Sequence, residues 1–365
     1  MNPLEEKLQD FVRNTVDKNK YIFNFLLTLS TGNKEFNWSG AEGVISREQR
    51  IIATPTTPFF IASITKLFTA TTIMKLYEEK KINLEDKIVD YLPESLVKGL
   101  HIFKGVDYTE TITIRHLLSH TSGIADYFLE KPKDGKSYFK MVLENPEKEI
   151  TIDQTITIAR EKLQPNFVPG NRAKYSDTNF QLLGRIIESV EKKELHDVYL
   201  DKIFTPLEMK NTWLYRMSEP IEKSKEPVAE IYYNNDVISS SKPFYAAWAD
   251  GGLISTTNDS LVFLRALFNG EILDKEKTLT LMHHWRSIGF PLKYGLGTMY
   301  IEFPAVMTMF RKLPGLTGHL GSTGTFLLYA EDIDLYLAGA INQANSPSKA
   351  VMIVLELLRK IGKEF

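Results

Sequence analysis

The sequence predicts an α+β protein in which strands near both ends of the chain share one antiparallel sheet and the middle forms an all-helical insert. Aromatic and branched residues flank turn residues near the start, in YIFNFLLTLSTGNKEFNWSG, and again near the end. Between about residues 85 and 290, helical patterns dominate. We therefore expect a discontinuous sheet domain, residues 1–84 and 291–365, a mainly helical domain, residues 85–290, and a ligand cleft between them.

Helices are expected at both ends of the chain, where they would flank the sheet. Between about residues 3 and 18, apolar residues recur at helical spacing, and the last segment, SKAVMIVLELLRKIG, has the same amphipathic pattern. A third helix, apolar on most faces, is expected from Ile64 to Lys80.

The strands are placed by their turn residues. In the first hairpin, Gly32 and Asn33 of the turn TGNK are expected to supply the unusual dihedral angles. Four strands are expected near the end, in YGLGTMYIEF, VMTMFRKL, GTFLLYAE and DLYLAGAINQ.

The composition limits the classes of partner. Lys plus Arg, 44, nearly balances Asp plus Glu, 46, without a basic stripe, so we expect a small-molecule ester, amide or short peptide partner and no nucleic acid. The absence of cysteine excludes disulfides, thiolate chemistry and cysteine-ligated zinc. We expect no metal, cofactor or membrane partner. The first residues lack a signal-peptide pattern, so we expect a cytoplasmic protein, or a secreted one if the chain has been trimmed.

The segment TPFFIASITKLFTATTIMKLYEEKK contains the first candidate site residues. Ser63 and Lys66 are three positions apart at the expected start of a helix, so their β-carbons lie about 5–6 Å apart on one face. The helix N-terminus offers backbone N–H groups and a positive dipole end to an oxyanion. Apolar neighbours would desolvate Lys66 and lower its pKa, which makes a lysine usable as a base. The pattern alone also fits a helix-capping serine and a lysine that extends to solvent.

Two further segments contain residues that could belong to the same site as Ser63 and Lys66. Tyr175 lies in PGNRAKYSDTNFQLLGRIIESV, before an expected helix, and His319 and Gly321 lie in LTGHLGSTGTFLLY, at the expected entry to a strand. Over roughly residues 22–345, the chain resembles the serine penicillin-recognising hydrolases, which comprise class C β-lactamases, D-peptidases and esterases of one β-lactamase/transpeptidase-like fold. The three family motifs, S-x-x-K, Y-x-N and K-T-G or H-x-G, match Ser63 to Lys66, Tyr175 to Asp177, and His319 to Gly321. The connecting segments TIRHLLSHTSGI, PLEMKNTWL and WADGGLISTTNDSLVFLRALFNG also match.

The resemblance implies a catalytic role for several residues. Ser63 would be the acylated nucleophile, Lys66 would activate it, and Tyr175 would move the proton to the leaving group. The backbone N–H groups of Ser63 and Ser322 would form the oxyanion hole, in which each donor is typically worth about 10²- to 10³-fold in rate. Substrate-binding roles are implied for Asp177, His319, Gly321 and Ser322.

Asp177 departs from the family pattern, which usually has Asn there. An ionised carboxylate can only accept hydrogen bonds. It can pair with Lys66 and keep it protonated, which would shift the base role towards Tyr175. It can equally cap the helix expected to begin near Thr178. Both interpretations stay open.

His319 is the second departure, because a lysine there would keep a fixed positive charge for a substrate carboxylate. Histidine with its ordinary pKa of about 6.5 is mostly neutral at pH 7, so binding of carboxylate-bearing β-lactams should be weaker. Gly321 would leave room for the acyl group beside His319, which would line the pocket opposite Ser63. For His120, in SHTSG, we expect a structural hydrogen bond.

The sequence therefore predicts a serine hydrolase that forms an acyl-enzyme from ester or amide substrates and has little β-lactamase activity. An alternative is a non-catalytic binding or sensing module in which Asp177 locks Lys66. A third possibility is a D-amino-acid peptidase in which Asp177 holds an N-terminal amine. Four aromatic residues would line the cleft or pack in the core: Tyr127, Phe128, Trp248 and Tyr294.

Overall fold

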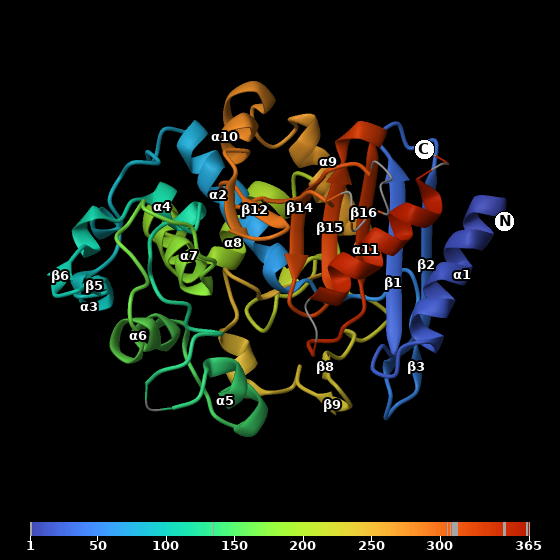
Figure 1. The fold of residues 1–365 in the computed structure, drawn as a ribbon, viewed down its shortest axis with the longest axis horizontal. Helices are drawn as coiled ribbons and strands as arrows, with labels where there is room; N and C mark the ends of the chain where they lie inside the picture. Colours follow the sequence, from blue (N-terminus) through green and yellow to red (C-terminus); the bar gives the residue numbers. More distant parts are fainter. Residues whose placement is uncertain are drawn as a thin grey trace.

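A large antiparallel sheet organises the molecule (Figure 1). The computed structural model describes residues 2–133, 135–304, 306, 308, 313–345, 348–362 and 364. Nine strands pair in the order β11 (Arg286–Gly289), β12 (Leu292–Tyr294), β13 (Met299–Ile301), β14 (Leu316–Gly321), β15 (Thr325–Ala330), β16 (Leu335–Ala340), β1 (Asn24–Thr31), β2 (Asn37–Ser46) and β3 (Ile51–Ile52). Because β1 pairs with β16, in a register that joins Leu27 to Gly339, the two ends of the chain share this sheet.

The remaining elements lie between β3 and β11 or at the two ends of the chain. Smaller sheets comprise β4 (Phe59–Phe60), β10 (Leu253–Ser255) and β7 (Trp213–Leu214); β5 (Ile102–Phe103) and β6 (Val106–Asp107); and β8 (Tyr232–Tyr233) and β9 (Asp236–Val237). The helices are α1 (Pro3–Asp17), α2 (Thr65–Glu78), α3 (Glu94–Val97), α4 (Ile114–Leu118), α5 (Tyr138–Glu144), α6 (Ile152–Lys162), α7 (Asp177–Glu191), α8 (Leu195–Tyr199), α9 (Thr257–Asn269), α10 (Thr280–Met282) and α11 (Ser348–Ile361).

The two faces of the sheet belong to different cores. Successive strand residues point to opposite faces, so Phe25 and Leu27 of β1 pack with α1 and α11, whereas Leu26 packs with α2 and α9. Figure 1 shows α11 in front of β15, β16 and β1. The N- and C-terminal helices therefore cover one face, as the sequence predicts.

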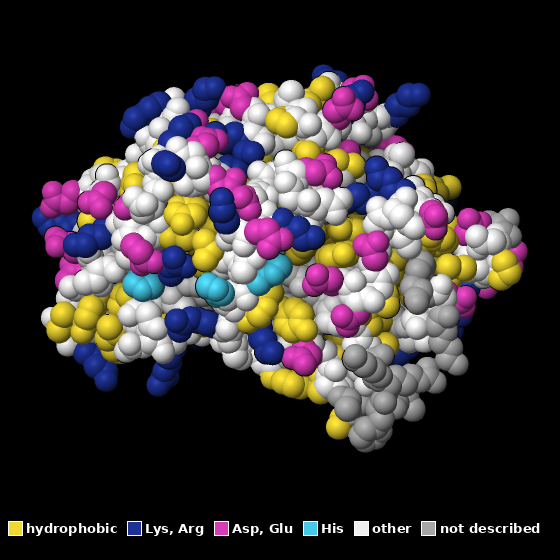
Figure 2. Space-filling model, turned by 90° about the horizontal axis from the view of Figure 1, so that it is seen from above, with side chains coloured by type: hydrophobic (Ala, Val, Ile, Leu, Met, Phe, Trp, Pro, Cys, Tyr) yellow, Lys and Arg dark blue, Asp and Glu magenta, His cyan; other side chains and the backbone are white. Residues whose placement is uncertain are grey.

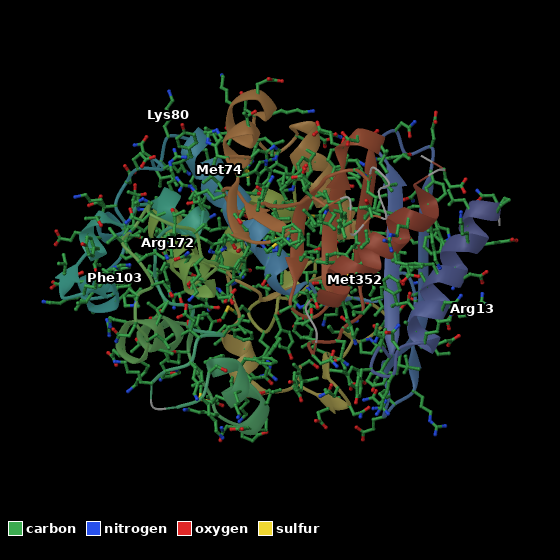
Figure 3. All side chains as sticks on the ribbon, in the orientation of Figure 1. Arg13, Met74, Lys80, Phe103, Arg172 and Met352 are labelled. Atoms are coloured by element: carbon green, nitrogen blue, oxygen red, sulfur yellow. The ribbon has the colours of Figure 1, made fainter. Side chains whose placement is uncertain are left out.

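The helix α2, at the expected cleft, is largely buried. Its residues from Thr65 to Met74 are all buried, although Lys66 and several threonines are among them. Figure 3 shows Met74 inside the molecule and Lys80, two residues past the helix, pointing outwards. A helix buried on every side is typical of the centre of a large protein, so polar groups on α2 require partners from its neighbours.

The α+β class and the shared sheet are confirmed, and several details differ from the predictions. The insert contains the short strands β5 to β10 as well as helices, so it is not all-helical. In the first hairpin the positive φ belongs to Lys34 rather than to Gly32 or Asn33. Gly32 instead allows close approach, because a Cβ there would lie 2.3 Å from the Asp334 carboxylate. Most of the expected strand VMTMFRKL lies outside the described residues.

The division into two domains stays a proposal. The helix α9 lies within residues 85–290, yet it packs against β1, β15 and β16 of the large sheet. A boundary drawn by packing would therefore assign this helix to the sheet domain.

The visible surface is electrostatically mixed. Figure 2 shows basic and acidic side chains interspersed over one face of the molecule. Within the described ranges, no helix has the length and apolar character needed to cross a membrane. Nor do His, Asp and Glu side chains gather in threes to hold a metal ion anywhere in the described part of the chain.

Candidate active site

Ser63 lies in a strained turn that leads into α2. The preceding residue, Ala62, has a φ of 49°, in the left-handed region that non-glycine residues rarely adopt. A 3₁₀ turn, Ala62–Ile64, follows and continues directly into α2. The strain is held from both sides, because Ile61 N–H donates to Leu253 and Ile61 C=O accepts from Thr325. Strain of this kind clusters at functional sites.

Lys66 lies one turn further on, with its amine directed at Ser63. Its Nζ donates to Ser63 Oγ at 3.2 Å and to the backbone oxygen of Asp250 at 2.5 Å. The third partner is Asp177 Oδ1, also at 2.5 Å. An ammonium group has three donors, and these acceptors satisfy all of them. Lys66 is 0% exposed, so the interpretation in which it extends to solvent is wrong.

The pKa of Lys66 is not lowered as its apolar neighbours predict, and agrees with the interpretation in which Asp177 keeps Lys66 protonated. Burial lowers it, as the apolar neighbours predict, but the carboxylates of Asp177 and Asp250 outweigh burial, so the pKa is raised above its ordinary value. Lys66 is therefore protonated at neutral pH in the resting site. The sequence argument counted the desolvation and not both carboxylates.

Asp177 is the ion-pair partner of Lys66 and not a helix cap. The helix α7 begins at Asp177 itself, and its N-cap residue, Ser176, makes no side-chain capping bond. The Asp177 side chain points to Lys66 from the first turn, where a carboxylate is also stabilised by the helix dipole. Of the two interpretations left open, pairing with Lys66 is confirmed.

Tyr175 lies across from Lys66 at the end of the loop before α7. The Lys66 amine is 5.1 Å from the centre of the Tyr175 ring. The Tyr175 hydroxyl faces Ser63 but forms no complete hydrogen bond within the described ranges. Burial and the charge of Asp177 raise the pKa of Tyr175 well above its ordinary value, although Ser63 opposes them. The phenol is therefore neutral and able to donate.

His120 holds the Tyr175 loop in place. Its Nδ1 accepts from Ser176 N–H at 3.2 Å, and its ring lies 4.3 Å from that of Tyr175. Burial and the charge of Lys66 lower the pKa of His120 well below its ordinary value, so the ring is neutral. The structural hydrogen bond expected of His120 is confirmed.

Two further carboxylates, which the sequence analysis did not single out, lie beside the Lys66–Asp177 pair. Asp250 Oδ2 accepts from Tyr127 OH at 2.8 Å and Oδ1 from Trp248 N–H at 3.0 Å. Burial raises the pKa of Asp250 to about 6, although Lys66 opposes this. Asp126 accepts from Asp177 N–H, and burial and Asp177 raise its pKa well above the ordinary value. The sequence contains one signal for a buried carboxylate at Asp250, because this residue lies among the small and apolar residues of WADGG.

His319 belongs to the sheet side of the site and is completely buried. Its Nδ1 lies 2.7 Å from Leu320 C=O, which can only accept, so Nδ1 carries the proton. Its Nε2 then accepts from Tyr294 OH at 3.1 Å. Burial and the charge of Lys66 lower the pKa of His319 to about 3. The ring is neutral, as expected, but it lies behind the cavity wall rather than in the lining.

Gly321 also lies outside the lining, at the end of β14 rather than at the entry to a strand. A Cβ there would lie 1.9 Å from Thr325 Oγ1 and 2.9 Å from Ile61 C=O. The missing side chain thus lets β14 approach the strained segment that holds Ser63. Ser322 follows directly and lines the cavity together with Ser63.

These residues meet at a cleft of about 780 Å³, part of it open to solvent. Tyr127 and Phe128 line it, whereas Trp248 and Tyr294 are buried outside the lining. The lining residues are Ala62, Ser63, Tyr127, Phe128, Leu129, Phe139, Tyr175, Asp177, Phe244, Ala247, Asp250, Gly251, Ser322, Thr323 and Ala344. The arrangement places a hydroxyl nucleophile, a lysine and a phenol at one end of an aromatic cleft, which suits acyl transfer.

Comparison with known proteins places this geometry in a family. The family model described as Beta-lactamase matches residues 15–359. Protein flp of Staphylococcus aureus (strain MW2) is 30% identical over 239 residues, which are 65% of this chain and 43% of that protein, so the match spans less than half of the relative.

Two solved structures share the fold. A D-stereospecific amidohydrolase from Streptomyces sp. has a TM-score of 0.76 at 28% identity, with 95% of this chain and 97% of the other covered. The D-amino acid amidase from Ochrobactrum anthropi SV3 has a TM-score of 0.79 at 23% identity, with 98% and 99% covered, a likeness of fold. Both likenesses extend over nearly the whole of each chain, so they concern the complete fold around the cleft.

Proposed function

Because this chain belongs to the Beta-lactamase family, we propose that it cleaves small amide or ester substrates through an acyl-enzyme formed at Ser63. The observation that supports this most directly is the 3.2 Å contact between Lys66 Nζ and Ser63 Oγ, with Tyr175 beside both. A nucleophile and a base within hydrogen-bond reach, in an aromatic cleft, are the minimum that acyl transfer needs.

The protonated state of Lys66 sets the order of the proton steps. Lys66 first gives its extra proton to solvent, which leaves a neutral amine 2.5 Å from Asp177 Oδ1. The amine then takes the hydroxyl proton of Ser63 while Oγ attacks the acyl carbon. As the bond to the leaving group breaks, Tyr175 donates its proton to the leaving atom, and Lys66 restores it. Water releases the acyl group by the same steps in reverse.

The developing oxyanion would be held by the backbone N–H groups of Ser63 and Ser322. Both residues line the cleft, from the turn before α2 and from the end of β14. Each such donor is typically worth about 10²- to 10³-fold in rate. The glycine at position 321 supports this pairing, because it lets the two segments lie in contact.

The cleft favours neutral or cationic substrates over β-lactams. No Lys, Arg or His is found among the described residues of its lining, and His319 is neutral behind it. A β-lactam carboxylate would therefore have no cation to pair with and would face Asp177 and Asp250. The resemblance to a D-stereospecific amidohydrolase supports amides of D-configured acyl groups as the first substrates to test.

The test is hydrolysis of p-nitrophenyl acetate and p-nitrophenyl butyrate by the wild-type protein and by Ser63→Ala, with the acyl adduct followed by intact mass. We expect turnover by the wild type and neither turnover nor adduct in the variant. Penicillins and cephalosporins should be hydrolysed at least about 100-fold more slowly than the esters, which corresponds to about 2.7 kcal/mol in the barrier. Efficient β-lactam turnover would contradict the proposed selectivity.

The Lys66–Asp177 ion pair favours one second candidate, a binding or sensing module that is acylated once. A carboxylate that keeps Lys66 protonated removes the base that deacylation needs. The same assay separates the two functions. A stable adduct at Ser63 without continued release of p-nitrophenol would support the sensor, and continued release would support the hydrolase.

A further inference from the structure

The wall of the cleft beside Ser63 contains more negative than positive charge. Asp177 and Asp250 both line it, and they are 7% and 4% exposed. Lys66 is the nearby cation, and it lies behind the wall with all of its donors in use. One lysine therefore faces two carboxylates. Burial and Asp177 raise the pKa of Asp126, a third carboxyl group nearby, well above its ordinary value.

Asp177 keeps part of its accepting capacity for a ligand. Its Oδ1 holds Lys66, and within the described chain Oδ2 has no hydrogen-bond partner. The side chain is 10% exposed, and the exposed part lies in the cleft. A carboxylate can accept about four hydrogen bonds, so a cation in the cleft can bind to Asp177 without displacing Lys66.

Asp250 has no cation of its own on its carboxylate. Its two oxygens accept from the Tyr127 hydroxyl and from a backbone N–H, both neutral donors. Lys66 contacts the backbone oxygen of Asp250 and not its carboxylate. A buried charge normally has a charged partner, and Asp250 lines the cleft, from which a bound cation can reach it.

A third and independent observation comes from the opposite wall. Thr323, in the turn after β14, is 1% exposed and lines the same cleft. Its hydroxyl has no hydrogen-bond partner among the described residues. A buried hydroxyl without a partner destabilises the folded protein, and a polar group of a bound substrate would satisfy it.

The rest of the lining is apolar and aromatic. Phe128, Phe139 and Phe244 form one side, and Leu129 is 62% exposed at its edge. Aromatic faces attract cations as well as apolar groups. The cleft thus combines an apolar surface with an unbalanced pair of carboxylates, a combination that suits an amine attached to a hydrophobic group.

We propose that the acyl part of the substrate bears a protonated primary amine, bound by Asp177 and Asp250, and a hydrophobic side group that packs on Phe128, Phe139 and Phe244. The Thr323 hydroxyl bonds to a polar group of the same substrate. This inference rests on the proposed function and narrows its substrates to amides and esters of amino acids with a free amine.

The test compares three 4-nitroanilides with the same aromatic group at pH 7. D-Phenylalanine 4-nitroanilide has the free amine, its N-acetyl derivative has it blocked, and 3-phenylpropionic acid 4-nitroanilide lacks it. We expect kcat/KM to be about 10- to 100-fold higher for the free amine, because a hydrogen bond to a charged group contributes about 1.5–3 kcal/mol. Turnover of all three within threefold, or preference for an uncharged one, would overturn the inference.

Asp250→Asn tests the assignment of the charge. The ratio of kcat/KM between the free-amine and the 3-phenylpropionic substrates should fall at least about fivefold, in line with the loss of one charged contact. The matched control is Asp201→Asn, an exposed carboxylate paired with Lys193, which should keep both the ratio and the basal rate. An unchanged ratio in Asp250→Asn would show that Asp250 does not bind the amine of the substrate.

A binding measurement covers the case in which the variant fails to fold. With the wild type and p-nitrophenyl butyrate, 2-phenylethylamine should inhibit at least about tenfold more strongly than 3-phenylpropionate. Equal inhibition would count against the inference. If neither the anilides nor the ester are hydrolysed and no adduct forms, the proposed function itself fails, whereas equal turnover of all substrates contradicts this inference alone.

Discussion

The two walls of the site differ in how they use charge. The helical wall, made by α2, α7 and the segment before β10, buries Lys66 among the carboxylates of Asp126, Asp177 and Asp250. The sheet wall, made by β14, contains the neutral His319 and offers the backbone of Ser322 to the cleft. Buried charges shift the pKa values of their neighbours strongly, and a neutral wall leaves backbone donors free of competing ions.

Under the proposed function, proton transfer belongs to the helical wall, and the sheet wall supplies Ser322, which binds the oxyanion together with Ser63 of the turn before α2. A lysine can take the Ser63 proton only when it is neutral, and the nearby carboxylates set the pH at which that form appears. An oxyanion, in contrast, is stabilised by fixed dipoles that need no rearrangement. The predictions below test this contrast, beginning with the helical wall.

Removal of the central cation should have the largest effect. In Lys66→Met, kcat/KM for p-nitrophenyl butyrate should fall about 10²- to 10⁴-fold, the usual range for loss of a general base. The free energy of unfolding should also fall, by about 3–5 kcal/mol, because the buried carboxylates lose their partner. Ester assays and urea unfolding measure the two effects.

The control is Lys75→Met on the same helix, whose amine bonds to a backbone oxygen, Ile272 C=O, rather than to a carboxylate. It should keep the activity of the wild type. If Lys66→Met retained more than a tenth of the activity, proton transfer would have to be assigned to another residue.

Asp177→Asn should change the pH dependence of the reaction. The carboxylate raises the pKa of Lys66, so its removal lowers that pKa and the neutral amine forms at lower pH. The rise of kcat/KM with pH should therefore move down by about 1–3 pH units, the usual effect of one close opposite charge. The measurement is a pH profile with p-nitrophenyl butyrate, which has no amine of its own.

Asp153→Asn is the matched control, because Asp153 pairs with Arg185 at the surface of α7 and is 57% exposed on its side chain. Its profile should follow that of the wild type. An unshifted profile in Asp177→Asn would show that the titrating group is not Lys66.

Asp250→Asn should show by how much the buried carboxylate of Asp250 destabilises the folded protein when it is ionised. Burial raises the pKa of Asp250 from 3.8 to about 6, so the folded state binds its proton more tightly than the unfolded state does. The stability of the wild type should therefore decrease as pH rises from about 4 to 6, by up to about 3 kcal/mol at 1.36 kcal/mol per pKa unit. Asn does not titrate. The free energy of unfolding of the variant, relative to that of the wild type, should therefore increase by this amount between pH 4 and pH 7.

Urea unfolding at the two pH values measures the change, with the exposed Asp201→Asn as the control that should show none. A difference between variant and wild type that is constant with pH would indicate that Asp250 is already protonated, or has a charged partner, at neutral pH.

Much of the fold followed from the sequence, because its signals are local. The aromatic and branched residues around the first turn and the amphipathic patterns of α1 and α11 predict the sheet and its cover. The turn at Lys34 was missed, since a glycine nearby attracted the prediction while its real constraint is the distant Asp334. The sheet packing of α9 was missed for the same reason, because amphipathic spacing does not say which partner a helix face meets.

The site was predicted where motifs have fixed spacing and missed where partners come from distant segments. Ser63, Lys66 and Tyr175 could be identified by their patterns, and the first two are in contact as expected. A protonated Lys66 held by Asp177 was one of the two open interpretations, but the contribution of Asp250 could not be predicted, because Asp250 is 184 positions away and contacts Lys66 only in the folded chain. The strain at Ala62 and the burial of His319 are likewise properties of packing.

The smallest effect is expected on the sheet wall, in His319→Gln. The wild-type ring is neutral, with a pKa of about 3, so it should contribute no change in kcat/KM near pH 6.5. Gln can still accept from Tyr294 OH, and loss of one neutral hydrogen bond costs about 0.5–1.5 kcal/mol in stability. We expect the two proteins to have pH profiles of the same shape between pH 5 and 8, with rates within about tenfold. A step near pH 6.5 that is present in the wild type and absent from His319→Gln would mean that the ring ionises. The sheet wall would then hold a cation able to bind a substrate carboxylate, and the contrast between a charged wall and a neutral one would no longer explain the selectivity of the cleft.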